Sequence, residues 1–217
     1  MVFTLIFIIF SFKVQIKYEI KMLSIMQQNH NLVFRRAETA DDFQKIFELQ
    51  NQNIVAALSK NDLKDGFLSG SFTLEQLRAV NDNICIMTCF AGLDLCGYHV
   101  ASTPEFNKTS PLLMQMMQQF NKINYKGKKL SEYDCFIAGP TCIAKEHRGQ
   151  NIYPQLIASS FDFLKNTHNP ARLRLSFASE LNPRSLNAQQ KNGCEIIGEF
   201  EFNTHKFMLL CLDLEDI

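Results

Sequence analysis

The sequence predicts a three-layer α/β sandwich, in which a mixed, mostly antiparallel sheet of about seven strands is covered by helices on both faces. Three observations lead to this fold class. Apolar runs with strand character recur along the chain, helix-capping sequences stand between many of them, and the last two runs follow each other without a helix. A length of 217 residues with 46% hydrophobic content fits one globular domain, or one domain with an appendage.

The first part of this domain alternates strand and helix signals. Residues 32–37 form an apolar run typical of a strand, and either Thr39 or Asp41 can cap the helix that follows. Residues 61–71 are rich in Asn, Asp, Gly and Ser, which is typical of a loop. Thr73 then begins a capping box that predicts a second helix.

The middle of the chain predicts a hairpin and a third helix. Two apolar runs, residues 84–91 and 95–101, are separated by a short turn at Gly92. Ser110 can cap a helix whose Met-rich stripe continues to Ile123 at helical spacing. Such a stripe is more often part of the core than a special surface.

A strand, a polar loop and a helix follow one another after residue 133. The strand covers residues 134–145 and is interrupted by Gly139-Pro140, which predicts a bulge or an edge position. The loop, residues 148–151, leads into an apolar-striped helix that begins near Ile152. A bulge would part this strand from the next one and leave backbone amides free in a cleft.

The last part of the chain contains three more strands and one helix. Residues 172–179 alternate as a strand, and Asn182-Pro183 begins a helix that ends at Asn192-Gly193. Residues 194–202 and 206–214 are the two final strands.

The N-terminal residues 1–31 are interpreted as an extension of the domain formed by residues 32–217. Residues 1–12 are strongly apolar but shorter than the roughly 20 residues of a membrane-spanning helix, so no membrane span is expected. Residues 13–22 alternate between polar and apolar side chains. An accessory strand, a membrane-surface segment and an upstream extension with Met22 or Met26 as the biological start all remain open.

Composition excludes several classes of function. Twenty-two basic and 22 acidic side chains give a formal net charge of zero, which argues against nucleic acid as a partner. The seven cysteines show neither Cys-x-x-Cys nor zinc-finger spacing, so no metal site is expected. Buried free thiols in a reducing compartment, and therefore a cytoplasmic protein, are the simplest interpretation.

The loop at residues 148–151 has the properties of a phosphate site. It joins a strand to the N-terminus of a helix, where backbone N–H groups are unpaired and the helix dipole favours negative charge. Amides from Gly149 to Tyr153 can hold a pyrophosphate, and Arg148 can add charge. The alternative is an ordinary bulged strand followed by a surface loop.

Three features together resemble the GNAT superfamily of acetyl-CoA-dependent N-acetyltransferases. The loop from His147 to Tyr153 resembles the family's pyrophosphate signature, Arg/Gln-x-x-Gly-x-Gly/Ala. The segment from Asn182 to Gly193 resembles the helix after the family's fifth strand, and the element order ends in the same pair of strands. Two positions depart from the signature, because Asn151 and Tyr153 stand where the family has small residues.

The resemblance implies a GNAT-like sandwich that takes acetyl-CoA as acyl donor. The pantetheine arm would pair with the backbone of the bulged strand like an additional strand. Asn182 would contact the pantetheine, and the pyrophosphate would lie against the loop. The expected cofactor-binding residues are Cys142, Ile143, Ala144, Arg148, Gly149, Gln150, Asn151, Ile152, Tyr153 and Asn182.

Acyl transfer to an amine requires a base for the amine and an acid for the leaving thiolate. Glu180 and Asp134 are the candidate bases, with Tyr133 and His99 as weaker alternatives. Many family members place a Tyr acid where this chain has Gln189, which can hydrogen-bond to the sulfur but cannot act as an acid. Cys142 is not expected to be a nucleophile, since an apolar strand raises the pKa of a thiol.

The sequence thus predicts an enzyme that moves an acetyl group by direct transfer to a primary amine of a small molecule, peptide or protein. The acceptor side would be built from residues 53–72, the turn at Gly92 and residues 103–129, whose charges do not identify the acceptor. One alternative is a catalytically weak or inactive acyl-CoA-binding module of the same fold. Another is an interaction protein whose N-terminal strand supports a homodimer.

Overall fold

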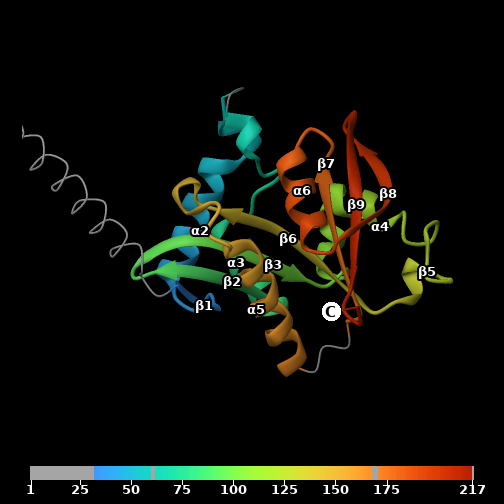
Figure 1. Ribbon diagram of the computed structural model, residues 1–217, viewed down its shortest axis with the longest axis horizontal. Helices are drawn as coiled ribbons and strands as arrows, with labels where there is room; N and C mark the ends of the chain where they lie inside the picture. Colours follow the sequence, from blue (N-terminus) through green and yellow to red (C-terminus); the bar gives the residue numbers. More distant parts are fainter. Residues whose placement is uncertain (1–31, 60–61, 168–170, 217) are drawn as a thin grey trace, which may run out of the picture. The chain divides into compact units, whose positions relative to one another are not determined.

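A computed structural model describes residues 32–59, 62–167 and 171–216 and contains a seven-stranded sheet (Figure 1). The spatial order of its strands is β1 (Leu32–Arg36), β2 (Cys85–Ala91), β3 (Asp94–Ser102), β6 (Cys135–Ile143), β7 (Leu173–Ser179), β9 (His205–Asp213) and β8 (Glu195–Phe202). Strand β6 pairs with β7 in parallel, whereas β2–β3, β3–β6, β7–β9 and β8–β9 are antiparallel. The predicted mixed, mostly antiparallel sheet is confirmed. The interpretations of residues 1–31 lie outside the described residues.

Helices cover both faces of this sheet, as predicted. Helices α2 (Ala40–Asn53) and α3 (Leu74–Asn83) pack on the face that carries Tyr98 and Val100. Helix α4 (Pro111–Met117) covers the same face farther along, where its side chains contact those of β7 and β9. Helices α5 (Ile152–Asn166) and α6 (Pro183–Lys191) cover the opposite face (Figure 1).

The helices begin at the residues that the capping signals indicate. Thr39, rather than Asp41, caps α2, and its hydroxyl accepts a hydrogen bond from the Asp42 amide. The capping box of Thr73 is present at the start of α3, and Ser110 caps α4. Asn182 caps α6, directly before a proline at the first helical position. Each cap satisfies an amide that the helix itself leaves unpaired.

Helix α4 is shorter than the apolar stripe predicts. It ends at Met117, and the chain turns back through β4 (Asn124–Tyr125) and β5 (Lys128–Lys129), which were not predicted. Phe120 still reaches the core, because the turns after α4 bring it against the same cluster as Met116. Tertiary packing of apolar side chains therefore preserves the stripe without a continuous helix. The expected loop before α3 likewise contains a short 3₁₀ segment, Asp62–Asp65.

All seven cysteines are free thiols, as expected, and Cys142 is among the buried ones. Burial raises the pKa of the Cys142 thiol to about 12, which agrees with the prediction that it is not a nucleophile. Across the described parts of the chain, every helix is too short or too polar to cross a bilayer.

Candidate functional site

Strands β6 and β7 pair at their beginnings and then separate. Their parallel pairing covers Cys135–Ile137 of β6 and ends there, although both strands continue. On its other side β6 remains paired with β3, with a register shift between Ala138 and Thr141. This shift contains Gly139-Pro140, so the predicted bulge is confirmed.

A cavity of about 850 Å³ lies along the separated strands. It is lined by β6, by the end of β7, by α6, and by segments before α3 and around α4. A volume of this size is that of a ligand-binding cleft. Four of the ten expected cofactor-binding residues do not line it: Ala144, Gln150, Asn151 and Ile152. The remaining six line it: Cys142, Ile143, Arg148, Gly149, Tyr153 and Asn182.

Backbone alternation decides which amides of β6 face the separated edge. The Ala144 amide donates to the Cys96 carbonyl of β3 at 2.9 Å, so the backbone N–H and C=O groups of Ala144 and Cys142 point toward β3. The backbone N–H and C=O groups of Thr141 and Ile143 point to the other side of β6, where β7 is no longer paired with it. The Cys142 side chain is in the apolar core beneath α2. The Thr141 backbone and the Ile143 N–H are therefore better placed than Cys142 to pair with an extended ligand, whereas the Ile143 carbonyl already accepts a hydrogen bond from Arg148.

The loop before α5 presents several free amides. Gly149 has a φ of +81° and Asn151 a φ of +60°, so Asn151 adopts the left-handed conformation that glycine provides in the family signature. Asn151 makes no side-chain cap to the helix. Among the described residues, no acceptor pairs with the amides of Gly149, Gln150 or Asn151, and the first helical amides lack partners by geometry. This is a cradle for an anion.

Arg148 points away from these amides. Its guanidinium donates to the Ile143 carbonyl at 3.0 Å, to the Asp65 carbonyl at 2.9 Å and to Oδ1 of Asn53 at 2.9 Å. The side chain therefore ties the end of β6 to α2 and to the segment before α3. Its predicted contribution of charge to a phosphate stays a prediction.

Arg148→Met is expected to lower the free energy of unfolding by about 2 kcal/mol, because three acceptors lose a charged donor in a half-buried place. Urea denaturation measures this loss, and Lys145→Met, which removes an exposed cation from the same segment, is the control. Unchanged stability together with weaker acetyl-CoA binding would instead place the guanidinium against the phosphate.

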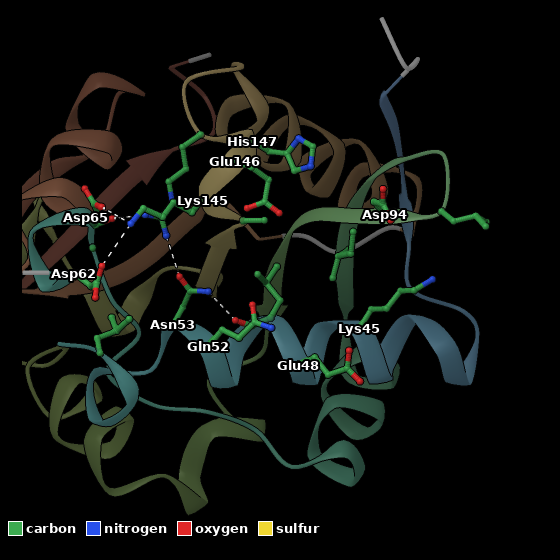
Figure 2. Close-up of a pocket in the computed structure, with 17 residues that line it drawn as sticks. Lys45, Glu48, Gln52, Asn53, Asp62, Asp65, Asp94, Lys145, Glu146 and His147 are labelled. Carbon is green, nitrogen blue, oxygen red and sulfur yellow. Dashed lines mark hydrogen bonds and ion pairs between the residues drawn. The ribbon is translucent and has the colours of Figure 1, made fainter. Parts of the chain in front are cut away.

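A second cavity, of about 610 Å³, is also lined by Arg148, and Figure 2 shows the charged side chains that surround it. It is bordered by α2, by the turn between β2 and β3 and by residues 144–148. Lys145 lies within 3.5 Å of Asp62 and 3.4 Å of Asp65, and Glu48, Asp94 and Glu146 add further carboxylates. The two cavities together are lined by parts of the three segments expected on the acceptor side.

A polar cluster is buried between the sheet and helices α5 and α6. Arg174 of β7 donates to the Tyr153 hydroxyl at 3.3 Å and to Sγ of Cys194 at 2.9 Å. Ser176 donates to Oε1 of Gln189 at 2.6 Å, and Gln189 donates to the Ser185 hydroxyl at 3.4 Å. Sequence reasoning missed Arg174 and Ser176. The available signal was a cation in a strand whose other residues are mostly apolar.

The candidate catalytic residues do not converge. Asp134 precedes β6 and lies at the opposite end of that strand from the loop, and Glu180 is exposed after β7. Neither lines the larger cavity, whereas Gln189 does. Tyr133 hydrogen-bonds to the Tyr125 carbonyl at 2.8 Å, in the β4–β5 region.

His99 is fully buried in β3, and its Nδ1 lies 2.7 Å from the Thr141 hydroxyl. Burial lowers the pKa of this imidazole, and the nearby charge of Arg174 lowers it further. Asn182 keeps its capping role, and its Nδ2 also donates to the Phe67 carbonyl at 2.8 Å. It thereby joins α6 to the segment before α3 at the wall of the cleft.

Comparison with known proteins identifies the architecture. No family model matches the sequence, and no curated protein matches it. Solved structures do match. NatC bound to Gag peptide and CoA is 12% identical with a TM-score of 0.55, covering 84% of this chain and 98% of that chain. SpeG, a spermidine/spermine N-acetyltransferase from Vibrio cholerae, is 14% identical with a TM-score of 0.53, covering 87% and 96%.

A ribosomal-protein-alanine N-acetyltransferase from Brucella melitensis is similar to the same extent. It is 14% identical with a TM-score of 0.54, and the match covers 84% of this chain and 99% of that chain. At such low identity these matches establish the fold alone. The described chain has the fold of the GNAT superfamily.

Proposed function

We propose that this protein is an N-acetyltransferase that takes acetyl-CoA as acyl donor and transfers the acetyl group directly to a primary amine of a small molecule, peptide or protein. The observation that carries the proposal is the cleft between the separated strands β6 and β7, with the free amides of the loop before α5 beside it. Neighbours of the same fold are described with acetyl-CoA or CoA bound, which supports this donor.

The residues present fit a CoA molecule. Amides from Gly149 to Tyr153 would hold the pyrophosphate, and Pro154, which has no N–H, leaves no further donor to satisfy. Thr141 and Ile143 would pair with the amides of the pantetheine. The cleft has a positive surplus, because its charged lining residues are Asp65, Arg148, Arg174 and Arg184. Seven free thiols support a cytoplasmic location, and a homodimer remains part of the proposal.

An acyl-CoA-binding module with weak or no turnover is the second candidate. Gln189 stands in the place of the family's acid and is held by Ser176 and Ser185, and the candidate bases Asp134 and Glu180 lie outside the cleft. These positions favour binding over rapid proton transfer. The two candidates share the cofactor and differ in the chemistry.

Release of free thiol from acetyl-CoA, measured against a panel of amines, separates them. The panel should contain a polyamine, peptides with free α-amino groups and a lysine peptide, because neighbours of the same fold include a spermidine/spermine N-acetyltransferase and a complex bound to a peptide. An N-acetyltransferase raises the rate above that of buffer with at least one amine, and mass spectrometry finds the acetylated product. Tight acetyl-CoA binding with no amine-dependent release across the panel would favour the binding module.

A further inference from the structure

Arg174 is a buried cation, and none of the carboxylates in the described parts of the chain forms an ion pair with it. The residue is 2% exposed, and its guanidinium contacts two hydroxyls and a thiol. Its Nε has no hydrogen-bond partner among the described residues. By contrast, Arg35 pairs with Asp42 and Arg172 with Asp213. A buried charge with such weak partners is costly unless something else supplies the counter-charge.

The groups that face this guanidinium are neutral at physiological pH. Burial raises the pKa of the Cys194 thiol and of the Tyr153 hydroxyl, even though the neighbouring cation lowers both. The His99 imidazole, on β3, has a lowered pKa and is also uncharged. Ser176 on the same strand does not titrate. The described residues around Arg174 therefore offer no anion, and the cleft that Arg174 lines is where one can enter.

The pyrophosphate and the sulfur of a bound CoA would lie at different depths in the cleft. The loop residues Gly149, Gln150 and Asn151 are exposed, so a pyrophosphate held there lies at the mouth of the cleft. Arg174 also lines the cleft but is only 2% exposed, and it contacts the Tyr153 hydroxyl at 3.3 Å. Through Ser176 it is also connected to Gln189, which cannot give up a proton. The inner end of the cofactor, which bears the sulfur, matches this position.

We propose that Arg174 stabilises the thiolate of CoA that leaves during acetyl transfer, in place of a proton-donating side chain. This role of Arg174 rests on the proposed function, acetyl transfer from acetyl-CoA. The amine nitrogen forms a bond to the thioester carbonyl carbon, the carbon–sulfur bond breaks, and its electron pair stays on sulfur. The nitrogen loses one proton, so the products are an amide, CoA thiolate and a proton. Arg174 keeps its own proton throughout and neutralises the sulfur by charge.

The test compares the affinities of CoA and acetyl-CoA as a function of pH in the full-length protein, by calorimetry. CoA carries an ionisable alkyl thiol, and a free cysteine thiol has a pKa of about 8.5 for comparison, whereas acetyl-CoA has no thiol. If Arg174 stabilises the thiolate, the bound thiol has a lowered pKa, so the ratio of affinities favours CoA increasingly as pH rises from about 7 to about 9. A shift of one pKa unit makes this ratio change by up to about tenfold, the full change being reached at a pH above both the free and the bound pKa. Titration of Tyr153, Cys194 or His99 affects both ligands and cancels in the ratio.

Three variants test whether Arg174 causes the pH dependence of the affinity ratio. Arg174→Met is expected to abolish the pH dependence of the ratio and to lower kcat about a hundredfold. Its thermal midpoint should be unchanged or higher, because a buried charge without an anion is removed. Arg174→Lys should restore part of the pH dependence. Arg78→Met, on the exposed surface of α3, should change none of these quantities.

Several results would overturn the inference. One is a flat ratio in the unaltered protein that nevertheless binds both ligands. Another is an Arg174→Met variant that keeps the pH dependence. Loss of affinity for adenosine 3′,5′-bisphosphate in Arg174→Met, with no change in the ratio, would show that the guanidinium binds phosphate instead. If neither CoA nor acetyl-CoA binds at all, the proposed function fails first, so the two failures are distinguishable.

Discussion

Asp213→Ala is expected to lower the free energy of unfolding by about 3 kcal/mol. The Asp213 carboxylate is enclosed and accepts hydrogen bonds from Arg172 and Lys126, both at 2.9 Å. Truncation removes the enclosed carboxylate that the two cations share at the end of β9, and leaves Lys126 with Asp216 at 2.7 Å and Arg172 with Glu215 at 2.9 Å, both more exposed partners. We take the lower end of the usual range, because Arg172 and Lys126 are themselves 34% and 39% exposed and water screens them.

The Asp213 effect also has a defined dependence on pH. Hydrogen bonding from Arg172, reinforced by Lys126, holds the pKa of this carboxyl well below its ordinary value of 3.8. A carboxyl whose pKa is lowered by folding stabilises the protein above its unfolded pKa, and this contribution is lost as pH falls below that value. Urea denaturation should therefore show the difference between the two proteins shrinking below about pH 4.

Glu199→Ala is the matched control for Asp213. It breaks the exposed pair between Glu199 and Lys206, which spans 2.9 Å, and should cost less than about 1 kcal/mol. Equal losses for Asp213→Ala and Glu199→Ala would contradict the assignment of a structural role to the buried carboxylate.

Gly149→Val is expected to weaken acetyl-CoA binding about 10- to 100-fold. Gly149 has a φ of +81°, which a β-branched residue adopts only with strain, so the loop amides would leave their positions. A Cβ at Gly149 meets no atom within 4 Å, so the side chain itself disturbs no packing. The space into which it would project is the space assigned to the pyrophosphate. Isothermal titration of the variant with acetyl-CoA measures the effect.

Gly127→Val separates strain from binding. Gly127 has a φ of +86°, and a Cβ there also meets no atom within 4 Å, but the residue is in the turn between β4 and β5 and lines neither cavity. The Gly127→Val variant should lose about as much stability as Gly149→Val and should keep the affinity of the unaltered protein for acetyl-CoA. If Gly149→Val binds as tightly as Gly127→Val, the phosphate does not lie at the loop before α5.

Short-range sequence patterns predicted the strands, the helix starts and the bulge that surround the cleft. Apolar runs, one of them alternating, located the seven strands, short polar caps such as Thr73 and Asn182 located the helix starts, and Gly139-Pro140 located the bulge. Each of these signals depends on a few neighbouring residues and on backbone geometry. Asn151 could also be understood in advance, because it is among the few non-glycine residues that tolerate a positive φ.

Contacts between distant parts of the chain could not be predicted in this way. Ser176 shares a face of β7 with Arg174, but the other contacts of Arg174, Tyr153 of α5 and Cys194 before β8, are connected to it by no spacing rule. Arg148 provides a second example. Its position in the loop predicted a phosphate contact, whereas its side chain reaches Asn53 and Asp65 far earlier in the sequence. Local pattern determines where a side chain starts, and tertiary packing determines what it reaches.

Calorimetric titration of the unaltered protein with acetyl-CoA is the decisive measurement for the coenzyme A cleft. The separated strands β6 and β7, the free amides before α5 and the positive surplus of the cleft predict saturable binding at one site per chain. The affinity should fall as salt is added, because charge on the phosphates contributes to binding. Absence of binding at millimolar acetyl-CoA would contradict the assignment of this cleft to coenzyme A.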